Sequence, residues 1–204
     1  MQSYEKKLKA QGYDLIIGVD EVGRGPLAGP VVAAAVLLKD FSFINRVTDS
    51  KKLTPAQRLA ASLEIKTKAY FSWGAVNHRK VDQINILQAT ILAMQKALTR
   101  LTQQLTAAQI KRVFVLIDGN MRLDLNLPYQ SIVRGDNKSL SIAAASILAK
   151  VARDKMMEHF GMLYPAYGFS QHKGYPTLAH RQILKQIGPS LIHRKSFLKC
   201  LGKT

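Results

Sequence analysis

Residues 15–38 read Leu-Ile-Ile-Gly-Val-Asp-Glu-Val-Gly-Arg-Gly-Pro-Leu-Ala-Gly-Pro-Val-Val-Ala-Ala-Ala-Val-Leu-Leu, and this segment is the clearest indication of the fold. Two apolar, partly β-branched runs, 15–19 and 31–38, flank a segment rich in glycine and proline. Short apolar runs bounded by turn residues are typical of buried strands. We therefore predict two neighbouring strands joined by a loop over 23–30, with the adjacent carboxylates Asp20 and Glu21 at the end of the first strand.

The rest of the chain alternates between helical and strand-like patterns. Further strands are predicted over 70–77, 112–117 and 132–134, and helices over 55–69, 81–105, 141–160 and 178–187. The buried face of the helix over 81–105 is predicted to carry Ile84, Leu87, Ile91, Met94, Leu98, Leu101 and Leu105. This order indicates an α/β or α+β fold with a mixed sheet. No repeat or linker interrupts the 204 residues, which predicts a single domain.

Charge indicates the kind of partner. Thirty Lys and Arg against thirteen Asp and Glu give a formal net charge of +17, which favours a polyanion, nucleic acid before an anionic membrane. The final 46 residues contain no acid but seven Lys or Arg and four of the five histidines, interleaved with tyrosines. This composition suits a surface that follows a phosphate backbone, although a solvated basic tail with packing tyrosines explains it equally well.

Several classes of protein are excluded or disfavoured. The longest uncharged apolar stretch, 27–38, is twelve residues, too short to span a bilayer, and the N-terminal pattern does not fit a signal peptide. A single cysteine, Cys200, excludes an internal disulfide and a cysteine-rich zinc site. We therefore expect a cytoplasmic protein.

The few carboxylates are placed in an informative way. Asp20-Glu21 is the only adjacent acidic pair, and Asp118 follows the apolar run 113–117. Two carboxylates about 4 Å apart repel by about 4 kcal/mol at an effective dielectric of 20, so convergence requires a bound cation or shared protons. Oxygen ligands favour magnesium or manganese over zinc. The alternative is that these acids only cap turns.

A fourth carboxylate could come from Asp136 or Asp154. They lie roughly 27 Å apart along the predicted helix, at 1.5 Å per residue, so they cannot serve one site. An i,i+4 pairing with Lys150 explains Asp154. The loop Gly23-x-Gly25-x-x-Ala28 matches a loose dinucleotide motif, but a strand rather than a helix follows it.

Six blocks of the chain, in order, resemble those of bacterial ribonuclease HII. They are Gly-Val-Asp-Glu-Val-Gly-Arg-Gly-Pro-Leu-Ala-Gly-Pro-Val-Val (18–32), Asp-Ser-Lys-Lys-Leu-Thr (49–54), Ile-Asp-Gly-Asn (117–120), Gly-Asp-Asn-Lys-Ser (135–139), Ala-Ala-Ala-Ser-Ile-Leu-Ala-Lys-Val-Ala-Arg-Asp (143–154) and His-Lys-Gly-Tyr-Pro-Thr (172–177). The resemblance implies an α/β fold with a ribonuclease H-like mixed five-stranded sheet flanked by helices. A catalytic core over about 13–160 and a basic, helical, substrate-binding extension over about 161–204 would together make one domain, 1–204.

The resemblance also implies the site residues. The family's four acidic catalytic and metal-binding positions fall on Asp20, Glu21, Asp118 and Asp136. Its substrate-binding positions fall on Gly23, Arg24 and Gly25, whose backbone would contact the ribonucleotide 2′-hydroxyl, on Tyr175, which would stack on the next deoxyribose, and on Lys51, Lys52 and Lys173, which would contact phosphates.

The implied activity is that of a metal-dependent endoribonuclease H. It would use two Mg²⁺ or Mn²⁺ ions to hydrolyse the phosphodiester 5′ to ribonucleotides in RNA/DNA hybrids or in duplex DNA carrying single ribonucleotides, and leave 3′-hydroxyl and 5′-phosphate ends. Ribonucleotide and RNA primer removal would be its roles, and a monomer is expected. A replication clamp is a conceivable partner, for which 195–199 offers an apolar pair without a recognisable motif. Rival interpretations are a carboxylate-metal nuclease of the same fold acting on DNA, and a binder without catalysis.

Overall fold

A mixed five-stranded sheet forms the centre of the molecule, and the computed structural model describes residues 1–198 of the chain. Lys199 and Cys200 lie outside that range. The strands are β1 (Leu15–Val22), β2 (Val31–Leu38), β3 (Ala69–Val76), β4 (Val113–Asp118) and β5 (Tyr129–Ile132). Their order is β3-β2-β1-β4-β5; β2 runs antiparallel to both β1 and β3, while β4 and β5 run parallel to β1. The predicted mixed sheet is confirmed.

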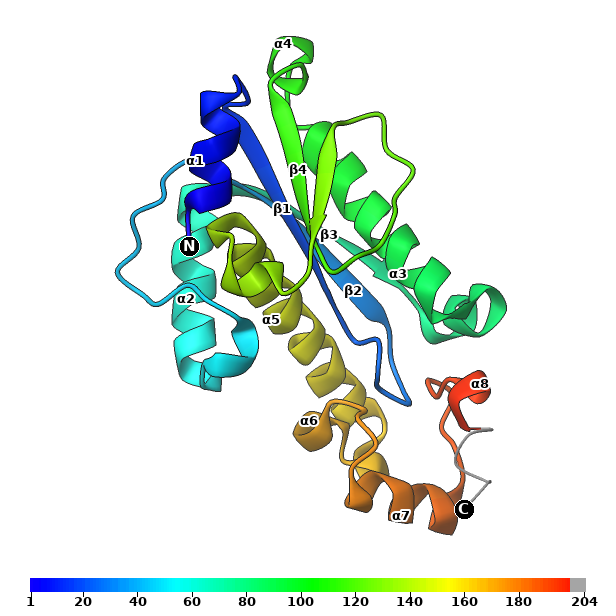
Figure 1. Cartoon of the computed structure of the whole chain (residues 1–204). Helices are drawn as coiled ribbons and strands as arrows, with labels where there is room; N and C mark the ends of the chain where they lie inside the picture. The colour runs from blue at the N-terminus through cyan, green and yellow to red at the C-terminus, as the bar shows by residue number, and fades with distance from the viewer. Residues whose placement is uncertain (199–204) are drawn as a thin grey trace.

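Helices cover both faces of the sheet (Figure 1). They are α1 (Ser3–Ala10), α2 (Pro55–Lys68), α3 (His78–Thr102), α4 (Ala107–Ile110), α5 (Leu140–Leu163), α6 (Phe169–His172), α7 (Leu178–Ile187) and α8 (Lys195–Leu198), with 3₁₀ turns η1 (Ser50–Lys52), η2 (Gly135–Asn137) and η3 (Pro165–Tyr167). Helix α3 packs on one face, and α1, α2 and α5 pack on the other. Helices α6 and α7 lie near the C-terminal end of α5, whereas α8 lies near the start of α3, where the Lys195 and Ser196 amides donate to Asp82. Within residues 1–198, no helix combines the length and apolarity needed to cross a bilayer.

Close contact between β1 and α5 brings the helix onto the end of the sheet that carries the acids. Ile17 and Val19 of β1 point into the core beneath α3, so Gly18 and Asp20 point toward α5. A Cβ atom on Gly18 would lie 2.1 Å from the carbonyl carbon of Ser141 in α5. Only glycine permits this approach, which places the N-terminal part of α5 beside Asp20.

Local sequence signals fix several boundaries. The Thr54 side chain accepts a hydrogen bond from the Gln57 amide, and the Gln57 side chain accepts one from the Thr54 amide. These two bonds form a capping box at the start of α2. The strand predicted over 31–38 and the helix predicted over 178–187 match β2 and α7.

The helix predicted over 81–105 is not continuous, because α3 is broken at Asn85. The backbone of α3 leaves helical geometry at Asn85 (φ 63°, ψ 169°), whose side chain accepts a hydrogen bond from the Gln88 amide and starts a second helical segment. Leu87 lies in the first turn of this second segment and is 44% exposed, so its predicted burial is wrong. The buried face beyond the break is formed by Ala89, Thr90, Ala93, Met94, Ala97, Leu98 and Leu101.

Two strand boundaries also differ from the prediction. The short strand predicted over 132–134 lies at Tyr129–Ile132, because Arg134 takes a left-handed conformation (φ 56°) that turns the chain into η2. Strand β1 continues to Val22, and Asp20 and Glu21 pair with Ala34 and Ala33 of β2. The two acids therefore lie inside the strand, where the sheet holds their backbone rigidly.

Candidate active site

Three of the predicted acids come from two adjacent parallel strands. Asp20 and Glu21 lie near the C-terminal end of β1, and Asp118 is the last residue of β4. Asp20 is buried, with 5% exposure, and accepts a hydrogen bond from the Glu21 amide at 2.7 Å. Asp118 Oδ1 accepts a hydrogen bond from the Gly135 amide at 2.6 Å, which ties the end of β4 to η2. The parallel β1–β4 pairing thus places the acids at one edge of the sheet.

The acids influence each other electrostatically. Burial raises the pKa of Asp20 well above its usual value, and the negative charges of Glu21 and Asp118 raise it further. Burial also raises the pKa of Glu21, where the Arg24 guanidinium lowers it and Asp118 raises it. Arg24 Nη1 lies 3.3 Å from Glu21 Oε1. The carboxylates therefore disfavour one another's ionised forms, and Arg24 offsets this effect in part at Glu21.

Asp136 joins this group from the η2 turn. It is 7% exposed, and its pKa is raised by burial and then by the charges of Asp118 and Asp49. Asp154 instead pairs with Lys150 at 2.7 Å, as predicted from their spacing, and with Arg58 at 3.7 Å. Of the two possible fourth acids, Asp136 is the one electrostatically linked to Asp118.

The donor set suits a hard divalent cation. Glu21 Oε2 is buried and has no hydrogen-bond partner within the described chain, so one carboxylate oxygen remains available to a ligand. Residues 1–198 contain no compact group of three or more His, Cys, Asp or Glu side chains that already encloses a metal position. The carboxylates interact electrostatically, but they do not form a closed set of ligands around one position. Oxygen-only donors of this kind fit magnesium or manganese.

The predicted glycine loop and the predicted tyrosine lie beside each other. Gly23 has φ +94°, and a Cβ atom there would lie 2.3 Å from Nε of Arg153. A Cβ atom on Gly25 would lie 3.9 Å from Cε1 of Tyr175, whose ring is 37% exposed. Gly23 directly follows β1, so the loop and tyrosine adjoin the acids.

The three predicted lysines differ in their surroundings. Lys51 and Lys52 belong to η1, where Lys51 lowers the pKa of Asp136 and Lys52 donates to Asn137 Oδ1. Lys173 donates to Glu158 Oε1 at 2.8 Å and to the Ser170 carbonyl at 2.6 Å. The η1 lysines are thus beside the acids, whereas the Lys173 ammonium is already engaged.

Sequence reasoning did not assign several residues that the structure connects to this site. Asp49 caps η1 and acts on Asp136, and Asn137 donates to Asp136 Oδ1 at 2.9 Å. Buried Arg153 and Arg194 contact the glycine loop. Asp49, Asn137 and Arg153 lie within the blocks 49–54, 135–139 and 143–154 that resemble the family. Arg194 lies outside those blocks, and nothing in the sequence distinguishes it from the other basic residues of the C-terminal region.

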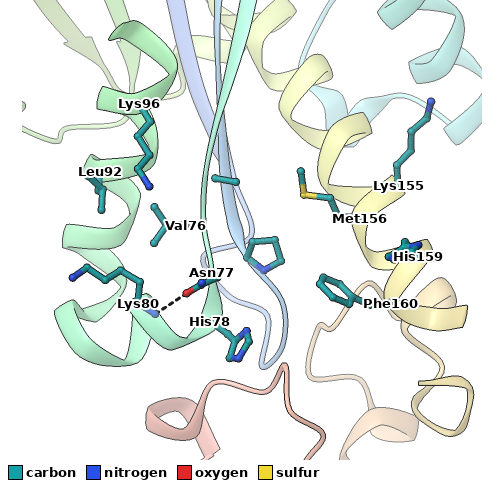
Figure 2. Close-up of a pocket in the computed structure, with 12 residues that line it drawn as sticks. Val76, Asn77, His78, Lys80, Leu92, Lys96, Lys155, Met156, His159 and Phe160 are labelled. Atoms are coloured by element: carbon teal, nitrogen blue, oxygen red, sulfur yellow. Dashed lines mark hydrogen bonds between the residues drawn. The ribbon is translucent and has the colours of Figure 1, made fainter. Parts of the chain in front are cut away.

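A cavity of about 780 Å³ lies away from the acids, between α3, the end of β3 and α5 (Figure 2). Its apolar wall includes Val76, Leu92 and Phe160, and its basic side chains include Lys80 and Lys155. No carboxylate is among the residues that line it, so this hollow is not the predicted metal site.

Comparisons with known proteins agree with this geometry. The family model for ribonuclease HII matches residues 17–200. A ribonuclease HII of Caldicellulosiruptor saccharolyticus is 48% identical over 196 residues, which cover 96% of this chain and 92% of that protein.

Solved structures share the fold at low identity. The ribonuclease HII of Archaeoglobus fulgidus, solved in complex with PCNA, has a TM-score of 0.72 at 22% identity over 89% of this chain and 94% of its own. Ribonuclease H2 of Pyrococcus horikoshii OT3 has a TM-score of 0.67 at 22% identity over 93% and 100% of the two chains. Bst-RNase HIII, solved with Mn²⁺, has a TM-score of 0.70 at 18% identity over 96% and 72%. The chain belongs to the ribonuclease HII family and is a ribonuclease H hydrolase.

Proposed function

We propose that the enzyme hydrolyses the phosphodiester on the 5′ side of a ribonucleotide, in an RNA/DNA hybrid or at a single ribonucleotide within duplex DNA. Water adds to phosphorus, the bond from phosphorus to the preceding 3′-oxygen breaks, and that oxygen leaves as a 3′-hydroxyl. The phosphate stays on the 5′ carbon of the ribonucleotide. The observation that carries this proposal is the coupling of Asp20, Glu21, Asp118 and Asp136 directly beside the loop 23–25.

The four carboxylates would hold the divalent cations on which the family depends. Two such ions would activate the attacking water and stabilise the departing oxygen. The residues of this chain would hold the cations through oxygen atoms, and Glu21 Oε2 is free for that purpose. The Asp118–Gly135 hydrogen bond of 2.6 Å would keep Asp118 and Asp136 oriented toward the same edge of the sheet.

Recognition of the ribose would come from the loop and the tyrosine. The backbone of Gly23, Arg24 and Gly25 would contact the 2′-hydroxyl, the group that separates RNA from DNA. Tyr175 would stack on the following deoxyribose, and its position beside Gly25 supports that role. Lys51, Lys52 and Lys173 would contact phosphates, for which Lys173 would exchange its bond with Glu158.

Cleavage of end-labelled duplexes tests the proposal. Duplexes carrying zero, one or four ribonucleotides are incubated with EDTA, Mg²⁺ or Mn²⁺, and the ends of the products are mapped. We expect cutting only with a metal ion and a ribonucleotide, on its 5′ side. Equal cutting of the all-DNA duplex would favour a DNA nuclease of the same fold, and binding without cutting would favour a non-catalytic binder.

Replacement of Asp118 by Asn tests the acids themselves. Asn keeps the shape and can still accept the Gly135 hydrogen bond, so the variant is expected to fold with a wild-type melting temperature. Loss of a charged oxygen ligand should lower metal-dependent cleavage by at least about 100-fold. Near-normal turnover would remove Asp118 from the site.

We further propose that the enzyme acts as a monomeric single domain in the cytoplasm and takes part in ribonucleotide and RNA primer removal. Contact with a replication clamp stays a prediction. Phe197, one of the two apolar residues considered for it, packs against the core and lies 5.1 Å from the Arg194 guanidinium. That packing leaves less of the segment available to a partner.

A further inference from the structure

Two buried arginines lie behind the glycine loop. Arg153 of α5 and Arg194, just before α8, are both 0% exposed. Neither forms an ion pair with a carboxylate within residues 1–198, although burying an unpaired charge is costly. Burial lowers the pKa of Arg194 to about 9, so its guanidinium remains charged at neutral pH. Each guanidinium is instead bonded to backbone carbonyls.

Arg194 holds the first part of the loop and its far end. Its Nη2 donates to the Gly23 carbonyl at 2.6 Å and to the Gly29 carbonyl at 2.9 Å. Its Nη1 donates to the Arg24 carbonyl at 3.0 Å, and its Nε donates to Gly29 at 3.1 Å. Its backbone amide also donates to the Leu27 carbonyl at 2.8 Å. One residue thus holds four carbonyls of the loop.

Arg153 holds the remainder and connects it to the tyrosine. Its Nε donates to the Pro30 carbonyl at 2.9 Å, and its Nη2 donates to the Ala28 carbonyl at 3.2 Å. Its Nη1 donates to the Lys173 carbonyl at 3.0 Å, two residues before Tyr175. The guanidinium carbon also lies 5.7 Å from the centre of the Tyr175 ring.

The backbone groups of the loop divide into two sets. Six of the eight carbonyls over 23–30 are held, namely those of Gly23, Arg24, Leu27, Ala28, Gly29 and Pro30. The Leu27 amide donates to Gly174 at 2.8 Å, and the Gly29 amide donates to Ile192 at 3.0 Å. The amides of Arg24 and Gly25 and the Gly25 carbonyl have no hydrogen-bond partner within residues 1–198. Unpaired backbone groups of this kind are available to a ligand.

We infer that Arg194 and Arg153 are positioning residues for ribose recognition: they draw the other loop carbonyls inward and leave the free groups of Arg24 and Gly25 facing the 2′-hydroxyl. This inference rests on the proposed function, since it concerns the group that the loop is proposed to read. The planar guanidinium is required, because its fork reaches several carbonyls at once and a lysine ammonium of equal charge cannot.

Arg194→Lys and Arg153→Lys test the inference at constant charge. Cleavage of a single-ribonucleotide duplex should fall about 100-fold through misplacement of the loop. In EDTA, the binding preference for that duplex over its all-deoxy counterpart should fall about tenfold, the worth of one or two hydrogen bonds. Affinity for the all-deoxy duplex should stay unchanged. An undiminished preference, or an equal loss of affinity for both duplexes, would overturn the inference.

Arg100→Lys is the matched control. Arg100 Nη1 donates to the Trp73 carbonyl at 2.8 Å on the edge strand β3, so this variant also loses a guanidinium bonded to backbone. It should keep both the cleavage rate and the preference for the ribonucleotide.

Hydrogen exchange in the free wild-type protein keeps the inference testable even where a variant does not fold. The Leu27 and Gly29 amides should exchange slowly, and those of Arg24 and Gly25 should exchange rapidly. Equal protection of all four would show that the loop has no free donors and would overturn the inference. Absence of any cleavage by the wild-type protein would count against the proposed function, while this exchange pattern would still test the loop.

Discussion

A chain of neutral histidines makes the C-terminal region sensitive to acid. His193 Nδ1 accepts a hydrogen bond from the Ser190 amide at 2.9 Å, so its Nε2 must carry the proton donated to His180 Nε2 at 3.0 Å. His180 Nδ1 is then free to donate to the Tyr175 carbonyl at 2.9 Å. An extra proton on His180 would set two N–H donors against each other at the His180–His193 contact, and an extra proton on His193 would do so at the Ser190 amide. Acidification should therefore destabilise the fold.

The pKa of His193 gives the magnitude. Burial, followed by the charges of His180 and then His172, lowers the pKa of His193 from 6.5 to about 4. The unfolded chain therefore binds more protons between these values, so the stabilisation is complete above pH 6.5 and is lost as pH falls toward 4. The pKa difference between the unfolded and folded states corresponds to about 3 kcal/mol in the free energy of unfolding, of which about 2 kcal/mol should be lost by pH 5.

Urea unfolding followed through the single tryptophan measures this loss. Trp73 lies 4.9 Å from Phe71, ring centre to ring centre, so its fluorescence should report unfolding of the sheet. The raised pKa values of Asp20, Glu21 and Asp136 act in the opposite direction, so the comparison must be with His193→Gln, which retains them. The advantage of wild type over the variant should shrink by about 2 kcal/mol between pH 7.5 and pH 5. Parallel pH profiles for the two proteins would show that protonation of His193 does not destabilise the fold.

Four further substitutions test the site and the packing. Asp20→Asn should stabilise the metal-free protein at pH 7, because the raised pKa of Asp20 reflects an unfavourable buried charge, and should abolish cleavage; a lower melting temperature in EDTA would contradict this. Gly18→Ala should destabilise the protein by about 3 kcal/mol or more in urea unfolding, since its methyl group would overlap the Ser141 backbone. Met94→Ala should cost about 2–5 kcal/mol. Leu87→Ala should cost much less because Leu87 is 44% exposed, and equal losses for these two variants would contradict that exposed position.

The sequence contained the main elements of the sheet because their signals are local. The run 31–38 is apolar throughout and is flanked by turn residues, and it forms β2 with those bounds. Thr54 and Gln57 carry the capping box that starts α2. The acids could be predicted as a group because carboxylates on neighbouring strands meet at one edge of a sheet.

Other features depend on contacts between distant residues and could not be predicted in this way. The break at Asn85 requires a left-handed backbone that helical periodicity does not detect, and that periodicity also does not show that Leu87 lies in the exposed first turn of the second segment. The link between Asp49 and Asp136 depends on η1 meeting η2 across 87 positions of sequence. The sequence shows Arg194 only as one more basic residue, because its contacts are with the loop 23–30, more than 160 residues away along the chain.

The position of Ile192 and Arg194 has a consequence for protein synthesis. The loop 23–30 is synthesised before these two residues, so its bonds to them can form only after more than 160 further residues have been added. The strands that carry Asp20 and Asp118 precede them by more than seventy residues. A nascent or truncated chain can therefore contain every proposed metal ligand while lacking the bonds that shape the loop proposed to read the ribose. On the proposed function, truncation before residue 192 should produce a protein that discriminates poorly between RNA and DNA although it retains the proposed catalytic acids.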